Sequence, residues 1–364
     1  MKLLIPTHVK HLAADWLTAV LHSTNVINMA QVEHVKATLV QINKGFIGQI
    51  ARLELKYTKD ENAPHTMIAK FSSSNPKMRE IGSEFGFYSR EVNFYRFLAP
   101  HVNLVTPKCY YSDIDNKGES HILLIEDLSN LENGNRFLGC SYHDALHVVT
   151  QFARFHAQWW ETSELTNLSW LPDLDTVYDF SQTPETFDSA WKVFKQKMEG
   201  IPFYVLEIGE RYSEHVIEVL NTLFQTPPRA VLHFDLHLDN LFFLRTVTHT
   251  QVIVVDWQLI TRGRGIVDIA CFLGQNLESN VRRQHELELL ESYYRGLVDS
   301  GVPDYSFQDC WHDYRLALLF HLFGFVFSLG ADSFTSEQEK FLIEHIIPRN
   351  MIAVEDLNAG ELLL

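Results

Sequence analysis

The sequence contains few cysteines and no paired cysteine motif. Four cysteines are scattered along the 364 residues without CxxC spacing: Cys109, Cys140, Cys271 and Cys310. A disulfide framework or a cysteine-based zinc site requires closely patterned cysteines, so we expect neither. We interpret the four as reduced, mostly buried thiols, and we expect a cytoplasmic protein.

Positive charge is also scarce. Lys and Arg total 30 against 46 for Asp and Glu, which gives a formal net charge of −16 at pH 7. Nucleic-acid binding requires a positively charged surface, so we expect no nucleic-acid partner. The balance is more compatible with a neutral or cationic small substrate, although net charge does not define one pocket.

Long hydrophobic runs are missing. The N-terminal residues 1–21 are interrupted by His, Lys and Asp before a signal-peptide core forms, and they are typical of an amphipathic helix. The most apolar stretch, residues 316–331, is shorter than the roughly 20 helical residues that cross a bilayer. We therefore expect a buried helix there and no membrane partner.

Internal repeats, low-complexity segments and flexible linkers are absent as well. The 364 residues exceed the usual size of one domain, so we expect two lobes. The predicted N-terminal lobe covers residues 1–127 and the C-terminal lobe residues 128–364, in a monomer or a homodimer. With 46% hydrophobic and 21% charged residues, the composition is that of an ordinary globular protein with a sizeable core.

The densest group of polar side chains lies between residues 231 and 258. Asp235 is followed by Asn240 five residues later, and Asp256 comes after a strand-like run at 252–255. This is the order of a kinase catalytic loop followed by its magnesium-binding aspartate. The first Asp can accept a hydroxyl proton, while the Asn and the second Asp supply oxygen ligands to Mg²⁺.

Two other interpretations of this loop stay open. His233, Asp235 and His237 alternate, and on an extended segment they would point the same way and could hold zinc. The Asp and Asn residues could instead be ordinary turn and cap residues. Neither interpretation accounts for Asp256.

The N-terminal part offers candidate phosphate-binding residues. Gly45 and Gly48 lie in a turn between predicted strands at 35–42 and 49–57, where the backbone could approach phosphates, although an ordinary hairpin turn explains them too. Lys70 lies inside a predicted strand at 66–71, as either an edge-strand guard or a phosphate ligand.

A predicted helix at 78–98 places Glu91 in an apolar stripe. An ionised carboxylate there is costly unless it is paired, so Glu91 either reaches water at the helix edge or pairs with Lys70. A further strand at 121–125 runs into Glu126 and Leu128, which we expect to form a hinge.

The C-terminal part shows helical periodicity over 141–162, 186–199, 204–223, 282–298 and 307–329. His156, Trp159 and Trp160 are better explained by core packing than by ligand contacts. Four other aromatic residues could surround a cationic or ring-shaped substrate, although ordinary packing explains each equally well: Trp257, Tyr293, Tyr294 and Trp311.

These motifs together resemble the aminoglycoside phosphotransferase and choline kinase superfamily, and more narrowly its ecdysteroid-kinase-like branch. The resemblance rests on motifs that follow a consistent order from about Trp16 to Gly274: Lys70, Glu91, Leu124-Ile125-Glu126-Asp127-Leu128, the loop from His233 to Asn240, Asp256-Trp257-Gln258 and Gly265-Ile266-Val267-Asp268-Ile269-Ala270. The branch is also similar in Arg90-Glu91-Val92-Asn93-Phe94-Tyr95 and in Phe155-His156-Ala157-Gln158-Trp159-Trp160.

The resemblance implies an α+β, bilobal protein-kinase-like fold with a small β-rich N-lobe and a larger, mainly helical C-lobe. It also implies ATP and Mg²⁺ as cofactors and transfer of the γ-phosphoryl group to a hydroxyl of a small-molecule acceptor. The roles carried over are these: Asp235 as catalytic base, Asn240 and Asp256 as metal ligands, Lys70 and Glu91 as the phosphate clamp, Asp268 as a brace of the catalytic loop, and Gly45, Gly48, Glu126 and Leu128 as further nucleotide contacts.

The sequence departs from this family in two places. Phe234 occupies the position where the family usually has the glycine of His-Gly-Asp, and the phosphate loop has only two glycines. A catalytically silent nucleotide-binding regulator is the alternative to an enzyme, and the intact Lys70, Asp235, Asn240 and Asp256 argue against it. A protein kinase is not favoured, because the Asp-Phe-Gly and Ala-Pro-Glu signatures are missing.

Overall fold

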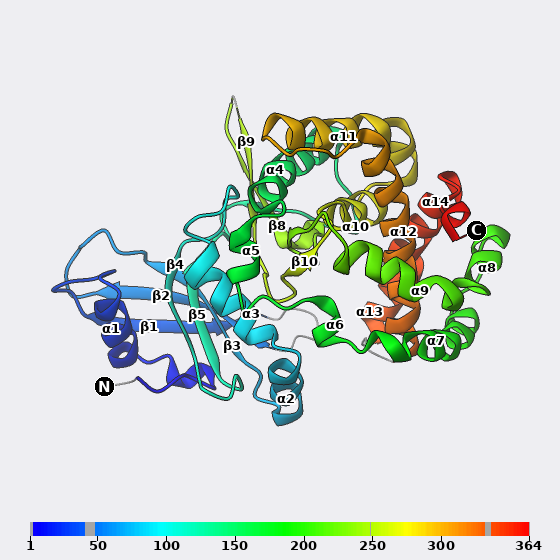
Figure 1. Ribbon diagram of the computed structural model, residues 1–364. Coiled ribbons are helices and arrows are strands. Elements are labelled where there is room, and N and C mark those ends of the chain that lie inside the picture. Colours follow the sequence, from blue (N-terminus) through cyan, green and yellow to red (C-terminus); the bar gives the residue numbers. More distant parts are fainter. Residues whose placement is uncertain (1–2, 41–47, 248, 332–335, 364) are drawn as a thin grey trace. The chain divides into compact units, whose positions relative to one another are not determined.

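The computed structural model describes residues 3–40, 48–247, 249–331 and 336–363 (Figure 1). The chain forms two compact units, and each is described by itself. The first consists of Met1–Leu131 and Val254–Leu259, and the second of Glu132–Ile253 and Ile260–Leu364. The segment that carries Asp256 thus groups with the N-terminal unit, a grouping that the expected division at residue 127 does not include.

The first unit is built on a five-stranded antiparallel sheet with the order β1-β2-β3-β5-β4. The strands are β1 (Val32–Leu39), β2 (Gly48–Tyr57), β3 (Thr66–Ser72), β4 (Cys109–Ile114) and β5 (His121–Glu126). Alternate residues of β2 are buried, and α1 (Ala14–Ser23) adds the buried Leu17, Val20 and Leu21 to the same core. Strand β3 lies between β2 and β5, so the interpretation of Lys70 as an edge-strand guard is wrong.

The expected single helix at 78–98 is interrupted. The structure forms α2 (Pro76–Glu84), α3 (Phe87–Asn93) and a π-helical turn, η2 (Phe94–Leu98). The break lies at Gly86, whose φ of 69° is in the left-handed region that favours glycine. A short 3₁₀ turn, η1 (Val9–His11), precedes α1.

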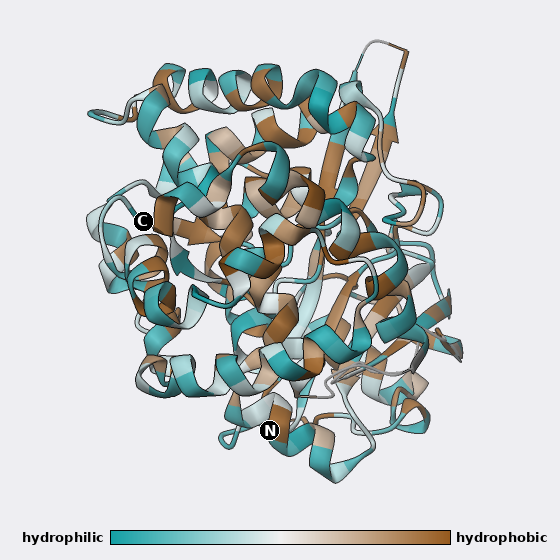
Figure 2. Ribbon diagram, turned by 90° about the vertical axis from the view of Figure 1, so that its right-hand side faces the viewer, coloured by the Kyte–Doolittle hydropathy of each residue, from teal (hydrophilic) through white to brown (hydrophobic). Residues whose placement is uncertain are grey.

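The second unit is mainly helical. Its helices and helical turns are α4 (Tyr142–Trp159), α5 (Ser163–Asn167), α6 (Leu174–Val177), η3 (Phe180–Gln182), α7 (Thr183–Lys197), α8 (Phe203–Gly209), α9 (Tyr212–Leu220), η4 (Asn221–Gln225), η5 (Leu238–Asn240), α10 (Ile266–Asn276), α11 (Ser279–Asp299), α12 (Phe307–Gly330), α13 (Ser336–Phe341), η6 (Leu342–Ile346), α14 (Ile347–Asp356) and η7 (Ala359–Leu363). Figure 2 shows mainly hydrophilic residues on α11, at the top, and largely hydrophobic ribbons in the middle of the unit.

Short strands complete the second unit. A three-stranded sheet has the order β6-β8-β9, and β7 pairs with β10 in antiparallel register. Their bounds are β6 (Glu132–Asn133), β7 (Ala230–Leu232), β8 (Leu241–Arg245), β9 (Thr250–Val254) and β10 (Thr261–Gly263). Strand β7 ends directly before the predicted catalytic loop, and β8 begins directly after it.

Another expectation about the helices was wrong. The single helix expected over 204–223 is divided, because α8 ends at Gly209, whose backbone lies against the Trp191 ring. The apolar stretch near residue 320 belongs to the 24-residue helix α12, which agrees with the helix expected over 307–329. By length and composition α12 could cross a membrane, but 56% of its apolar window is buried inside the structure, as in the core helix of a globular protein.

The close approach of α4 and α11 gives a stability prediction. An added Cβ at Gly296 of α11 would lie 2.6 Å from the Cβ of Ala153 in α4, whereas an added Cβ at Gly324 of α12 meets nothing within 4 Å. Gly296→Ala should lower the free energy of unfolding by about 1–3 kcal/mol through overpacking. Gly324→Ala should leave it unchanged or raise it by about 0.5–1 kcal/mol, because alanine favours helix. Denaturant unfolding of both variants checks this; equal effects would contradict it.

Candidate active site

The first unit brings three predicted site residues together around one ammonium group. Lys70 Nζ in β3 lies 2.6 Å from Glu91 Oε1 in α3 and 3.1 Å from Asp256 Oδ1, which follows β9. The side chains are 15%, 4% and 14% exposed, in that order. The Lys70–Glu91 pair indicated by the sequence is therefore present. The alternative, in which Glu91 reaches water at the helix edge, is wrong.

Charge in this cluster is governed by burial and by the mutual contacts. Burial alone would lower the pKa of Lys70, but the carboxylates of Asp256 and Glu91 raise that pKa above its usual value. Burial raises the pKa of Glu91, and Asp256 adds to this effect while Lys70 opposes it. Two carboxylates beside one ammonium give an excess of negative charge when all are ionised, which is an environment suited to a hard cation.

The backbone at Asp256 is unusual. Its φ of 68° lies in the left-handed region, which costs a non-glycine residue about 1–2 kcal/mol. The next residue holds this conformation in place, because the Trp257 ring is fully buried and stacks on Phe94 at 3.8 Å between centroids. Strained backbone of this kind is found preferentially at functional sites.

The remaining predicted nucleotide contacts are less distinctive. Gly45 lies outside the described residues. Gly48 is the first residue of β2, and an added Cβ there would lie 3.1 Å from the Phe71 carbonyl oxygen, so strand packing alone accounts for this glycine. Glu126 ends β5 and accepts the backbone N–H of Lys108 through its carboxylate, while Leu128 is buried just beyond the strand.

The second unit contains the predicted catalytic loop. Asn240 Nδ2 donates to the backbone oxygen of Asp235 at 3.0 Å and lies 3.2 Å from its Oδ2. His237 Nε2 lies 3.3 Å from the same Oδ2 and 3.2 Å from Asn240 Nδ2. Burial would raise the pKa of Asp235, but His237, with smaller contributions from Arg136 and His233, holds it below the usual range. The loop therefore presents an ionised carboxylate.

Asp268 at the start of α10 braces this loop, as the resemblance implied. Its carboxylate is fully buried and accepts the backbone N–H groups of His233 and Phe234, each at 2.8 Å. Asp268 Oδ2 also lies 3.2 Å from His156 Nε2, and His156 Nδ1 lies 2.9 Å from the Tyr293 hydroxyl. His156 is thus a buried support of the brace, in agreement with the core-packing interpretation.

The aromatic residue in place of the family glycine has a defined environment. Phe234 has a φ of 68°, a conformation that glycine adopts without strain. Its ring packs against Phe224 of η4 and Phe320 of α12, at 5.6 and 5.9 Å between centroids. The chain therefore places an aromatic wall beside Asp235, where the family pattern has no side chain.

A second support of the loop was missed by the sequence analysis. Asn133 Nδ2 donates to the backbone oxygens of Asp239 and Leu241, and the Asp239 carboxylate accepts from Arg136 N at 2.9 Å and Arg136 Nε at 2.7 Å. Gly134 lies so close that an added Cβ would be 2.3 Å from the Leu238 carbonyl oxygen. The adjacent Asn133 and Gly134 were the only hint of this contact in the sequence. The loop residues that they contact lie about a hundred residues away in the chain, so the contact could not be predicted from a local pattern.

The structure does not favour the zinc interpretation of the loop. No group of three or more His, Cys, Asp or Glu side chains within the described ranges is arranged to hold a metal ion. His233 Nδ1 instead accepts the backbone N–H of Asp235 at 3.2 Å. Among the four aromatic residues considered for ligand contacts, Trp257 and Tyr293 are fully buried, so these two belong to the core.

The brace gives a second prediction. Asp268→Asn places an amide group against two backbone N–H donors, so it should lower the free energy of unfolding by about 2–3 kcal/mol, the contribution of hydrogen bonds to a charged group. The control, Asp188→Asn on α7, alters an exposed carboxylate away from the loop and should change stability by less than about 0.5 kcal/mol. Denaturant titration of both proteins tests this, and a harmless Asp268→Asn would show that the brace does not hold the loop.

Comparison with solved structures shows the same fold in small-molecule kinases. The microcompartment-associated aminopropanol kinase is 14% identical, with a TM-score of 0.55 over 96% of this chain and 99% of that one. Aminoglycoside 2'-phosphotransferase-IIIa in its GDP complex is 12% identical, with a TM-score of 0.52 over 95% of this chain and 99% of that one. Plasmodium vivax ethanolamine kinase is 11% identical, with a TM-score of 0.50 over 92% of this chain and 85% of that one. The expected kinase-like fold, with an antiparallel N-terminal sheet and a mainly helical C-terminal part, is confirmed.

Sequence comparison provides two further findings. The Caenorhabditis elegans protein named "Uncharacterized oxidoreductase dhs-27" is 22% identical over 335 residues, and the match spans 83% of this chain but only 39% of that protein. The model of the ecdysteroid kinase-like family matches residues 43–301, well over half of the chain. On this match, and with the kinase-like fold described above, the chain belongs to the ecdysteroid kinase-like family.

Proposed function

We propose that this protein is a phosphotransferase that moves the γ-phosphoryl group of ATP to a hydroxyl of a small molecule. The observation that supports this most strongly is the buried Lys70 ammonium held between Glu91 and Asp256. A lysine fixed by a helix glutamate beside a metal-binding aspartate is the arrangement with which kinases hold nucleotide phosphates.

The chemistry of the donor set fits a metal–nucleotide complex. Lys70 would contact the phosphates, Asp256 and Asn240 would hold Mg²⁺ through oxygen atoms, and the backbone at Glu126 and Leu128 would contact the adenine. Asp256 lies in the first unit and Asn240 in the second, so their sharing of one ion stays a prediction from the family resemblance. When bound, ATP supplies the transferred group and Mg²⁺ offsets the phosphate charge.

Asp235 would act on the acceptor. Its lowered pKa keeps the carboxylate ionised at neutral pH but also makes it a weak base. We therefore expect Asp235 to orient the acceptor hydroxyl first and to take its proton only as the new bond to phosphorus forms. His237 and Asn240 fix the carboxylate from one side, which leaves its position well defined.

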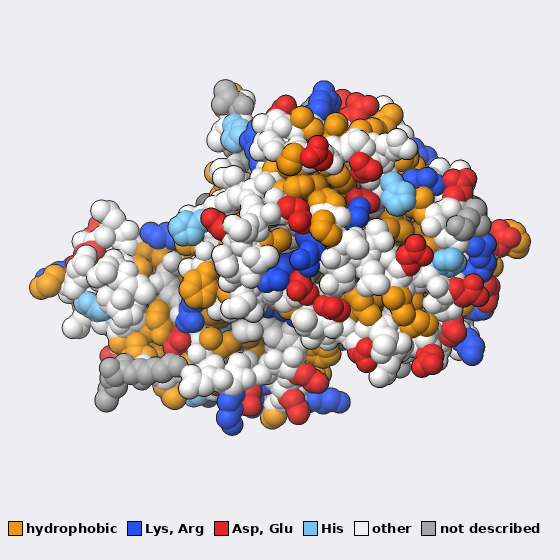
Figure 3. Space-filling model, viewed as in Figure 1, with side chains coloured by type: hydrophobic (Ala, Val, Ile, Leu, Met, Phe, Trp, Pro, Cys, Tyr) orange, Lys and Arg blue, Asp and Glu red, His pale blue; other side chains and the backbone are white. Residues whose placement is uncertain are grey.

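The acceptor would be a neutral or cationic small molecule. Phe234 and Phe320, which pack on the fully buried Phe224, would offer apolar contact to the part of the acceptor next to the reacting hydroxyl. On the face shown in Figure 3, acidic and basic side chains are interspersed, which is compatible with the absence of a nucleic-acid partner. We further propose a cytoplasmic location.

The experiment that tests this function is a screen of small hydroxyl compounds for acceptor-dependent ATP consumption. Turnover should require Mg²⁺ or Mn²⁺, because Asn240 and Asp256 offer hard oxygen ligands, and Zn²⁺ should not replace them. Absence of turnover with every acceptor, together with tight nucleotide binding, would instead identify a catalytically silent regulator. Tightly held stoichiometric zinc on His233 and His237 would contradict the kinase-type metal site.

Replacement of the proposed base should separate chemistry from binding. Asp235→Asn should lower turnover on an acceptor from the screen by about 10²- to 10⁴-fold, because the amide cannot accept the hydroxyl proton. Nucleotide affinity should stay nearly unchanged, whereas Asp256→Asn should weaken it by removing a metal ligand. The exposed Asp188→Asn on α7 is the control for loss of a carboxylate. If Asp235→Asn keeps more than about a tenth of the turnover, the base lies elsewhere.

A further inference from the structure

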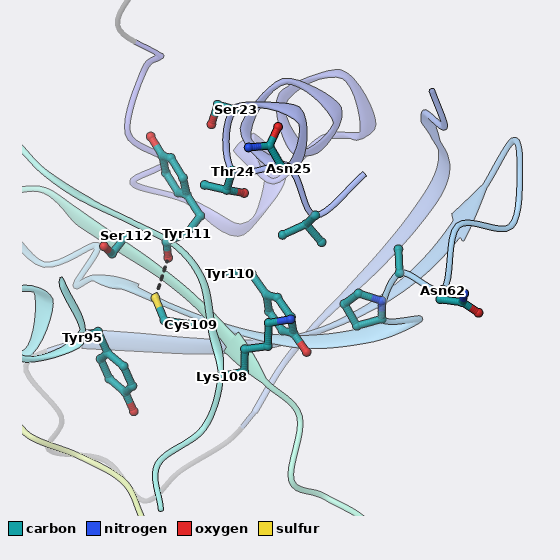
Figure 4. A pocket seen from close by; sticks show the side chains of 13 residues that line it. Ser23, Thr24, Asn25, Asn62, Tyr95, Lys108, Cys109, Tyr110, Tyr111 and Ser112 are labelled. Carbon is teal, nitrogen blue, oxygen red and sulfur yellow. Dashed lines mark hydrogen bonds between the residues drawn. The ribbon is translucent and has the colours of Figure 1, made fainter. Parts of the chain in front are cut away.

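The first unit contains a cavity that the proposed reaction does not use. It has a volume of about 610 Å³ and is lined by residues 23–26, 62–64, 95 and 108–112, which come from the end of α1, the loop before β3, the turn η2 and strand β4 (Figure 4). Cavities of this size bind small molecules in many proteins. Every lining residue belongs to the same compact unit.

The charge of the lining is opposite to that of the whole chain. Among the described residues that line the cavity, Lys108 is the only charged one, although the protein carries a net charge of −16. Its Nζ lies 5.5 Å from the centre of the Tyr110 ring, near the middle of the view in Figure 4. The nearby Glu126 carboxylate accepts the backbone N–H of Lys108 and does not line the cavity. An anion would therefore meet one ammonium and no carboxylate on these walls.

The rest of the lining combines rings with neutral polar groups. Tyr95, Tyr110 and Tyr111 line the cavity with their rings, of which Tyr95 and Tyr110 are 4% and 8% exposed, and Figure 4 shows the side chains of Asn25 near the top of the view and Asn62 at its right. Ring surfaces contact a planar ligand well, while amide and hydroxyl groups supply hydrogen bonds that fix its orientation. The lining thus suits a small molecule that has both a planar ring and a negative charge.

Tyr95 connects this cavity to the Lys70 cluster. Its ring lines the cavity, and its buried hydroxyl finds no hydrogen-bond partner among the described residues. It follows Glu91 by four residues. The neighbouring Phe94 ring lies 5.3 Å from the Tyr95 ring and 3.8 Å from that of Trp257, which is adjacent to Asp256. Burial raises the pKa of Tyr95, and the negative charges of Glu91 and Asp256 add to this, which agrees with their proximity.

We propose that this cavity is a second ligand site, that it takes a small organic anion with a planar ring, and that η2 couples its occupancy to the Lys70, Glu91 and Asp256 cluster. A ligand that packs against Tyr95 would restrain the helical turn that follows Glu91 and packs on Trp257. The coupling rests on the proposed function, since it requires that the cluster bind nucleotide. The existence of the ligand site does not depend on the proposed function.

The site is tested with 4-(trifluoromethyl)benzoate as a probe, followed by ¹⁹F NMR without nucleotide. Binding should saturate below about 10 mM, as for a small fragment. Lys108→Met keeps a long side chain but removes the charge, and it should raise the Kd of the probe at least about threefold. Lys117→Met is the matched control, because Lys117 is exposed in the turn after β4 and does not line the cavity. No saturable binding, or equal affinity in all three proteins, would overturn the site.

The coupling is tested by measuring the Kd of MgATP with and without saturating probe. We expect a change of at least about threefold, with an equal reciprocal change in probe affinity, as linkage requires. An unchanged Kd for MgATP would overturn the coupling while the site stands. If the wild-type protein binds no MgATP, the proposed function and the coupling fail together, and the probe titration still decides the site.

Discussion

The ammonium group of Lys70 is buried, and burial of a charge is tolerated only when partners compensate the lost hydration, which is worth several kcal/mol per ion. Here the partners come from two other elements, Glu91 on α3 and Asp256 after β9. One cation therefore fixes the central strand, the helix beside it and a segment almost two hundred residues further along the chain. The excess of carboxylate over ammonium makes the same cluster a candidate cation site.

The loop that carries Asp235, the proposed catalytic loop, depends on a comparable constraint in the second unit. Its backbone turns sharply at Phe234, in a conformation that this residue adopts at a cost. The two backbone N–H groups at the turn are held by the buried carboxylate of Asp268, which His156 and Tyr293 support in turn. The Asp268 carboxylate thus stabilises the turn at Phe234, and the Phe234 ring occupies space where the family pattern has only glycine.

Local sequence patterns predicted much of this arrangement. Alternation and periodicity located most strands and helices, and the position of Glu91 in an apolar stripe indicated a buried partner. What they could not predict depends on distant segments. Whether Lys70 lies on an edge strand depends on the position of β3 in the sheet. That position depends on pairing with distant strands, so the residues of β3 alone do not predict it. The clamp of Asn133 on the catalytic loop and the break at Gly209 against Trp191 depend on contacts that no local pattern specifies. The cavity behind Tyr95 is assembled from four separate segments.

We propose above all that Lys70, Glu91 and Asp256 form the phosphate and metal side of a kinase site. A crystal structure with Mg²⁺ and a non-hydrolysable ATP analogue tests it most directly. We expect that Lys70 Nζ contacts the phosphates while it keeps its pair with Glu91, and that the metal ion is bound by Asp256 and Asn240. A nucleotide bound elsewhere, or a metal ion bound by His233 and His237, would contradict it.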